Sequence, residues 1–350
     1  MSFSRLLRPD GCSRARLILI LLILGTLPAG AQPLRIAFGS CARISLPQPI
    51  WHAIVEWQPG AFVTLGDIVY ADTEDMALMK AMYAQMDNVA GFQTLRNSCP
   101  FYGIWDDHDY GQNDSGASYG KREEAQQVFL DFLHEPADSK RRKTPGIYDA
   151  VYLDAEKRVQ LILLDVRFFR SDWVGDKVAE MRYRPVYEPG RTMLGETQWQ
   201  WLESQLRLPA QVRLVATGVQ VVNDTHGYEC WGLFPLERDR LFQMIRETKA
   251  SGLVFVSGDR HFAELSVMDG GVGYPMYDLT TSGLTNTARD GHKAPNNKRV
   301  GEAFNGVNFG TVTIDLDADE PDLVLEIRGL DKMPASTHRI LLSDLQFQND

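Results

Sequence analysis

The sequence contains few cysteines, which limits the disulfides that it can form. Only 4 of its 350 residues are cysteines, and one of them, Cys12, lies in the N-terminal leader described below. Cys41, Cys99 and Cys230 remain, and an odd number leaves at least one thiol outside any disulfide within the chain. A bridge between Cys99 and Cys230, which would leave Cys41 free, is one arrangement that the sequence leaves open.

An apolar run long enough to cross a membrane is also missing. The N-terminal run spans residues 17–27, whereas a membrane-spanning helix needs ~20 residues. It follows four arginines and precedes Ala29-Gly30-Ala31, which is typical of a secretory signal peptide. We therefore expect residues 1–31 to be cleaved off before Gln32 and the protein to be periplasmic or secreted. An uncleaved anchor is the alternative, and the absence of an Arg-Arg pair in the leader excludes a twin-arginine signal.

Basic residues are fewer than acidic ones. The chain has 36 lysines and arginines against 46 aspartates and glutamates, which gives a formal net charge of −10. A surface of this charge disfavours nucleic acid and anionic membranes as stable partners. A negatively charged substrate would need local cations, and bound metal ions would supply them. Because no internal repeat or low-complexity tract divides the chain, we predict a single domain over residues 32–350.

The sequence does contain a dense acidic cluster, Trp105-Asp106-Asp107-His108-Asp109. It follows the apolar residues 100–104, which indicate a short buried strand. Carboxylates at the end of a buried strand repel one another and lose hydration unless a cation lies among them. A metal centre is the favoured interpretation, and a solvated acidic turn is the alternative.

Short apolar segments alternate with segments of helical periodicity along the chain, which predicts an α/β fold. The pattern predicts helices over residues 50–58, 74–88, 121–133, 196–206 and 236–249. It predicts strands over residues 34–38, 61–65, 101–105, 159–165, 212–222, 253–257, 277–281, 310–316 and 323–328.

Four of the expected strands end in a turn with polar or metal-ligating side chains. The turns are Gly39-Ser40-Cys41, Gly66-Asp67, Asp106–Asp109 and Gly258–His261. Ligands of open α/β sheets bind at the carboxyl ends of the strands, so the four turns together predict one site.

The side chains in these turns differ in the metals that they favour. Cys41 and Tyr70 offer a thiolate and a phenolate, which stabilise a trivalent or soft transition ion, and the imidazole of His261 suits iron or zinc. The carboxylates of Asp107 and Asp259 suit a harder ion such as calcium, magnesium or manganese. The sequence therefore predicts two unequal metal pockets.

The order and spacing of the motifs resemble the PhoD-like alkaline phosphatase/phosphodiesterase family of the calcineurin-like metallophosphoesterases. Matching segments run through most of residues 32–350. They are Phe38–Cys41, Leu65–Tyr70, Trp105–Asp109, Leu164–Arg167, Leu194–Leu202 and Ser257–His261. The resemblance implies a four-layer αββα sandwich of two mixed β-sheets with a dinuclear or larger metal centre. The usual metals of the family are iron with calcium, and manganese, magnesium and zinc are alternatives.

The resemblance also implies roles for individual residues. Asp67 corresponds to the bridging carboxylate, His108 to the catalytic histidine and Asp109 to the acid that orients it. The metal ligands that it implies are Cys41, Tyr70, Asp107, Asp259 and His261.

Two further residues were open to more than one interpretation. Gln220 lies on the strand where the wider superfamily has a histidine ligand, and its amide oxygen could bind calcium. A structural amide is the alternative for Gln220. Arg167 could clamp a phosphate with its guanidinium group, or it could form an ion pair with Asp165 or another acid.

These assignments predict hydrolysis of a small phosphate monoester or diester. A metal-bound hydroxide would attack phosphorus, and His108 would protonate the leaving group as a general acid. A phospholipase D-like enzyme on the same scaffold and a non-catalytic secreted metal-binding protein are the competing hypotheses.

Overall fold

The computed structural model describes residues 32–176 and 181–348, so the expected signal peptide lies outside the described residues. Within them, two mixed β-sheets carry the fold. The first sheet has the strand order β13 (Pro334–Leu341), β12 (Asp322–Arg328), β11 (Phe309–Asp315), β1 (Leu34–Gly39), β2 (Ala61–Leu65), β3 (Phe101–Ile104). The second has the order β10 (Arg299–Phe304), β8 (Ala263–Met268), β9 (Met276–Thr281), β7 (Leu253–Ser257), β6 (Val212–Thr217), β5 (Val159–Leu163), β4 (Asp149–Tyr152).

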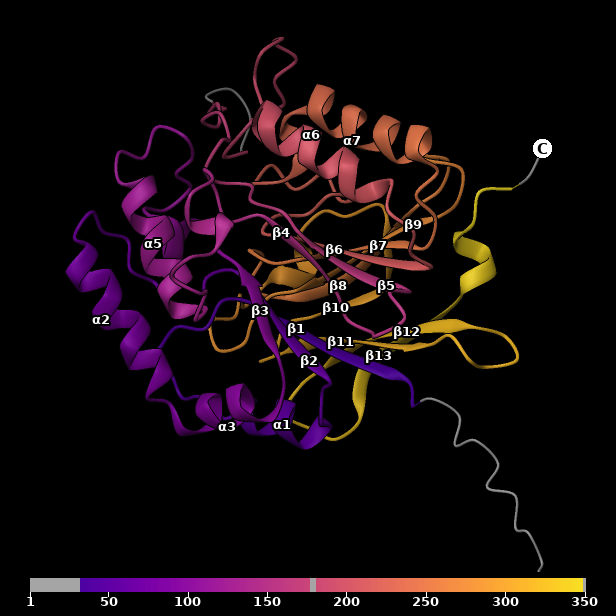
Figure 1. The fold of residues 1–350 in the computed structure, drawn as a ribbon, viewed down its shortest axis with the longest axis horizontal. Coiled ribbons are helices and arrows are strands. Elements are labelled where there is room, and N and C mark those ends of the chain that lie inside the picture. The colour runs from indigo at the N-terminus through magenta and orange to yellow at the C-terminus, as the bar shows by residue number, and fades with distance from the viewer. Residues whose placement is uncertain (1–31, 177–180, 349–350) are drawn as a thin grey trace, which may run out of the picture. The chain divides into compact units, whose positions relative to one another are not determined.

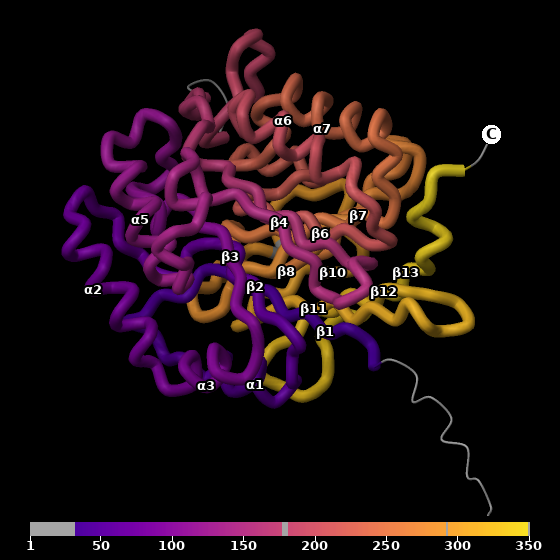
Figure 2. The backbone as a smooth tube through the Cα atoms, viewed as in Figure 1, coloured from indigo at the N-terminus to yellow at the C-terminus, as the bar shows by residue number. Residues whose placement is uncertain are grey.

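Helices cover the outer sides of the two sheets, which gives the expected four-layer αββα sandwich (Figures 1 and 2). Helices on the side of the first sheet are α1 (Ile50–Trp57), α2 (Met76–Asp87), α3 (Ala90–Ser98) and α5 (Arg122–Phe132). Helices α6 (Gly195–Leu206) and α7 (Pro235–Thr248) lie over the second sheet. The short helical segments are α4 (Asp107–Tyr110), η1 (Lys140–Arg142), η2 (Trp231–Leu233), η3 (Gly291–Lys293) and η4 (Leu342–Leu345). None of the helices in the described part of the chain could span a membrane.

Burial along the strands follows their place in the sandwich. Every residue of β2, β5, β6 and β7 is buried, because these inner strands are covered on both faces. In β12, by contrast, Leu323, Leu325 and Ile327 are buried and alternate with partly exposed residues. This alternation is typical of an antiparallel strand with one face toward the core.

The ends of β1 and β9 join the two sheets. Ser40, which follows β1, donates its hydroxyl to the carbonyl oxygen of Thr281 at 3.2 Å. Its own carbonyl oxygen accepts from the backbone amides of Gly283 and Leu284 at 3.1 and 2.9 Å. The turns that carry the motif residues are therefore held together by buried hydrogen bonds across the sandwich.

Some boundaries differ from the prediction. The strand expected over residues 212–222 ends at Thr217, and Gln220 beyond it forms an isolated bridge with Cys230. The prediction was too long because Val219, Val221 and Val222 are apolar. These residues are buried in a turn and not in a strand. Residues 284–309, for which no strand was predicted, contain β10.

Gly66, which follows β2, packs closely against the acidic turn. Its φ is +98°, and a Cβ atom added there would lie 2.3 Å from the Cβ of Asp106 and 2.5 Å from its backbone nitrogen. Only glycine fits such a backbone conformation without strain, and only a residue without a side chain fits this contact.

We expect Gly66→Ala to lower the free energy of unfolding by about 2–4 kcal/mol, through backbone strain and overpacking. Urea titration followed by tryptophan fluorescence measures this change. Gly120→Ala is the matched control, since a Cβ atom at Gly120 would meet nothing within 4 Å. Equal urea midpoints for the two variants would contradict the prediction.

Candidate metal centre

The turns that carry the expected ligands have an unusual backbone. Four of the expected ligands adopt a positive φ: Cys41 (63°), Asp67 (52°), Asp259 (66°) and His261 (61°). This left-handed conformation is uncommon for residues other than glycine, and it is concentrated at functional sites where surrounding contacts stabilise it.

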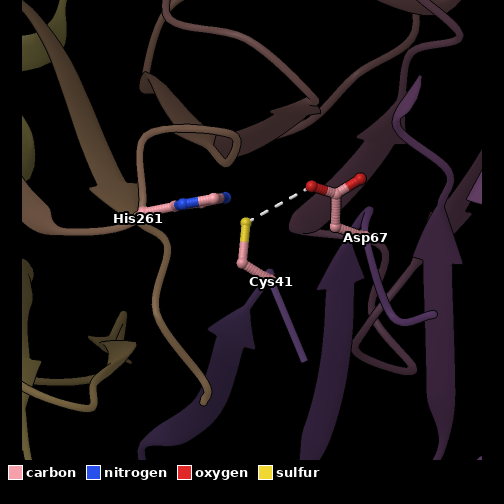
Figure 3. Close-up of side chains that lie close together, drawn as sticks. All are labelled: Cys41, Asp67 and His261. Atoms are coloured by element: carbon pink, nitrogen blue, oxygen red, sulfur yellow. Dashed lines mark hydrogen bonds between the residues drawn. The ribbon is translucent and has the colours of Figure 1, made fainter. Parts of the chain in front are cut away.

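The first group of side chains combines sulfur, oxygen and nitrogen ligands. Single ligand atoms of Cys41, Asp67 and His261 lie within 4.8 Å of one another (Figure 3). The Cys41 thiol donates to Asp67 Oδ2 at 3.5 Å, and the Tyr70 hydroxyl lies 3.2 Å from His261 Nε2. The structure thus brings one cysteine, one tyrosine, one carboxylate and one imidazole together from three separate turns.

Asp67 also belongs to a second group. Ligand atoms of Asp67, Asp107 and His108 lie within the same 4.8 Å of one another. A carboxylate shared by two groups is suited to bridge two cations.

A third group includes a residue that the sequence analysis missed. It consists of Asp107, Asp114 and Glu229. Glu229 belongs to a polar segment far from the motifs in sequence, and no spacing pattern marks it. It lies beside Asp107 because the segment before η2 folds back over the carboxyl ends of the second sheet.

These groups open into a cavity of about 500 Å³. Asp107, His108, Asp259 and His261 line one part of it. Asp259 therefore lies at the same cavity as the other expected ligands, although it belongs to none of the three groups described above.

A model of the PhoD-like phosphatase family matches residues 36–320. The chain belongs to this family. It is therefore a phosphoester hydrolase, and its clustered side chains are of types that could hold metal ions. No curated protein sequence matched the chain.

Solved structures resemble this PhoD-like phosphatase in fold. A structure of PhoD is 16% identical, with a TM-score of 0.69 over 92% of this chain and 75% of the other. GAP50, the anchor in the inner membrane complex of Plasmodium, is 14% identical, with a TM-score of 0.55 and coverage of 91% and 90%. A dimetal phosphatase from Danio rerio is 13% identical, with a TM-score of 0.54 and coverage of 89% and 99%.

Burial makes the acidic groups of this phosphatase hard to ionise without a cation. Burial, and then the neighbouring Cys41, hold the pKa of Asp67 well above its usual range. Burial and Glu229 raise the pKa of Asp259 to about 7, and burial raises the pKa of the Cys41 thiol to about 12. The pKa of His261 falls to about 4 because of burial and then the nearby His108 and Arg260. A neutral imidazole and acids in need of counter-charge fit a metal centre.

The contact that orients His108 differs from the one that the sequence suggested. His108 Nδ1 lies 2.7 Å from Asp72 Oδ1, and the backbone carbonyl of His108 accepts from the amides of Ala71 and Asp72. The carboxylate of Asp109, which was expected to orient His108, instead accepts from the amides of Ile68 and Asp106 at 3.0 and 2.5 Å. Asp109 therefore stabilises the two turns, while Asp72 contacts the imidazole.

Arg167 is fully buried among acids. Its Nε donates to Asp106 Oδ1 at 2.6 Å, and its Nη1 donates to Glu229 Oε1 at 2.5 Å. Although burial alone would raise the pKa of Glu229, Arg167 lowers it to about 2. Arg167 thus forms ion pairs, which was one of its two interpretations from the sequence. Its partners are Asp106 and Glu229, and not Asp165.

Gln220 is engaged by other side chains. Its Nε2 donates to Glu264 Oε1 at 2.8 Å and to Thr280 Oγ1 at 2.7 Å. Its amide oxygen lies 3.5 Å from Asn223 Nδ2.

The remaining cysteines, Cys99 and Cys230, are free thiols like Cys41, so no bridge joins them.

The Asp72 contact predicts a change in the titration of His108. Burial alone would lower the pKa of His108, but the hydrogen bond from Asp72 and the charges of Asp107, Asp72 and Asp109 raise it above its ordinary value. We expect Asp72→Asn to lower this pKa, because the variant loses an acceptor and a charge that stabilise the imidazolium. Titration of the metal-free protein by NMR measures the shift, with the exposed Glu74→Gln as the control. The same pKa in wild type and Asp72→Asn would refute the assignment.

Proposed function

We propose that the chain is an exported phosphatase or phosphodiesterase that acts on small phosphate esters. The observation that supports this most strongly is the sharing of Asp67 between two groups of ligands, beneath a cavity that is lined by His108. A shared carboxylate suits two cations a few Å apart, and paired cations suit phosphoryl transfer. The leader over residues 1–31 supports export.

We further propose that the two metals differ. Cys41, Tyr70 and His261 would hold iron, since thiolate, phenolate and imidazole suit a transition ion. Asp107 and Asp259 would hold calcium, which prefers carboxylate oxygens. Asp67 would bridge the two ions. We leave Gln220 outside this ligand set, because its amide nitrogen donates to Glu264 and Thr280 and its amide oxygen faces Asn223 Nδ2 at 3.5 Å.

The bound metals would supply charge neutralisation at the phosphoryl group and a nucleophilic water. His108 lines the cavity and would donate a proton to the leaving oxygen as the general acid. Asp72 would hold the imidazole in place through Nδ1 and leave Nε2 for the substrate. Because the pKa of His108 is raised, a larger fraction of the imidazole carries this proton near neutral pH.

We expect Cys41→Ala to lose iron while it retains calcium, because the variant lacks the only thiolate in the proposed site. Hydrolysis should fall by more than the ~10–100-fold that is typical when a metal site loses an outer-shell partner. Elemental analysis of purified protein measures both metals. Cys99→Ala is the matched control, since Cys99 follows α3 at a distance from the ligand turns. Unchanged iron in Cys41→Ala would remove Cys41 from the ligand set.

We expect His108→Ala to lower kcat by about 10²–10⁴-fold with metal content largely retained, because the variant lacks the general acid. Turnover of nitrophenyl phosphate and bis-nitrophenyl phosphate, paired with elemental analysis, separates the two effects. His52→Ala, an exposed histidine on α1, is the control. Equal losses of metal and activity would make His108 a ligand, and a wild type inactive on both esters would end the proposal.

A further inference from the structure

Among the cations around the cavity, one has unused hydrogen-bond donors. The basic side chains that line the cavity are those of Arg182, Arg260 and Lys293. Arg182 forms an ion pair with Asp114, and Lys293 forms one with Asp290 at 2.9 Å. Among the described residues, the guanidinium of Arg260 donates no hydrogen bond. Its Nη1 lies 3.6 Å from Asp259 Oδ2, which is longer than a hydrogen bond.

The Arg260 side chain is also mostly shielded from water. Its side chain is 10% exposed, and its Nε is buried without an acceptor. Three other arginines also have a buried Nε without an acceptor: Arg170, Arg213 and Arg238. Their terminal nitrogens, however, donate hydrogen bonds to carbonyl or carboxylate oxygens. A buried N–H without an acceptor is costly, and the guanidinium lines the cavity with no hydrogen bond to the described residues, which points to an anion that is bound there during function.

Two aromatic rings hold the guanidinium at the cavity wall. Arg260 Cζ lies 4.9 Å from the ring centroid of Tyr228 and 5.6 Å from that of Phe262. Both rings line the same cavity. Cation–π contacts position the charge but leave the in-plane N–H donors available. In the sequence, Arg260 lies between the proposed ligands Asp259 and His261, so this charge borders the metal centre.

We propose that Arg260 binds the phosphoryl oxygens of the substrate and favours phosphate monoesters over diesters. The inference rests on the proposed function. A guanidinium group can donate two parallel N–H bonds to two phosphate oxygens. A monoester dianion carries more negative charge on its free oxygens than a diester monoanion, so it gains more from a nearby cation. Arg167 is less suited to this task, because its donors are bonded to Asp106 and Glu229.

The test compares Arg260→Gln and Arg260→Met with wild type at measured metal content. Charged hydrogen bonds predict that the KM for nitrophenyl phosphate and the inhibition constant of inorganic phosphate rise about 10–100-fold. We expect a smaller rise in KM for bis-nitrophenyl phosphate and little change in kcat. Arg260→Lys, which keeps the charge but loses the planar fork, should lie between wild type and these variants. Arg207→Gln on the exposed end of α6 is the charge-matched control, with all constants unchanged.

Three results would overturn the inference. They are an unchanged phosphate inhibition constant in metal-loaded Arg260→Gln and Arg260→Met, equal effects on both esters, and loss of metal from both variants. The last result would make Arg260 a support for the ligand turn. Each of them leaves the proposed function standing as long as wild type hydrolyses either ester, so the two failures are distinguishable.

Discussion

Crowding of negative charge at a buried edge is the constraint on which the rest of this structure depends. Asp67, Asp106, Asp107 and Asp109 are buried within a few residues of strand ends, and Asp259 reaches them from the other sheet. Arg167 compensates Asp106 and Glu229 through direct hydrogen bonds. Burial raises the pKa values of Asp67, Asp259 and the Cys41 thiol, so these groups need further cations to ionise. Metal binding and the stability of these turns are thereby linked.

Both sheets are required to assemble this edge. The first supplies Cys41, Asp67 and Asp107, and the second supplies Asp259 and His261. Hydrogen bonds between the end of β1 and the end of β9 hold the two halves in register. The left-handed residues in the turns aim short side chains at a common point, and the packed core around them stabilises that conformation.

The sequence predicted most strands of the first sheet well and several strands of the second sheet poorly. β1, β2, β3, β11 and β12 lie within one residue of their expected bounds, whereas β4, β8 and β10 of the second sheet were not predicted. β13 was not predicted, because most of its side chains are partly or fully exposed and leave no hydrophobic pattern. Expected ligands in the motif turns do meet in space, since the carboxyl ends of neighbouring strands share an edge.

The sequence by itself determined the family, the fold class and the residue types at each strand end, because these are local patterns with fixed spacing. Only the tertiary structure decided how the polar groups pair. It placed Asp72 on His108, Glu229 on Arg167, and Arg260 in the cavity without a hydrogen-bond acceptor among the described residues. Glu229 lies 62 residues from Arg167 in the chain, and packing of loops over the sheet edge sets such contacts. Spacing along a sequence carries no signal for them.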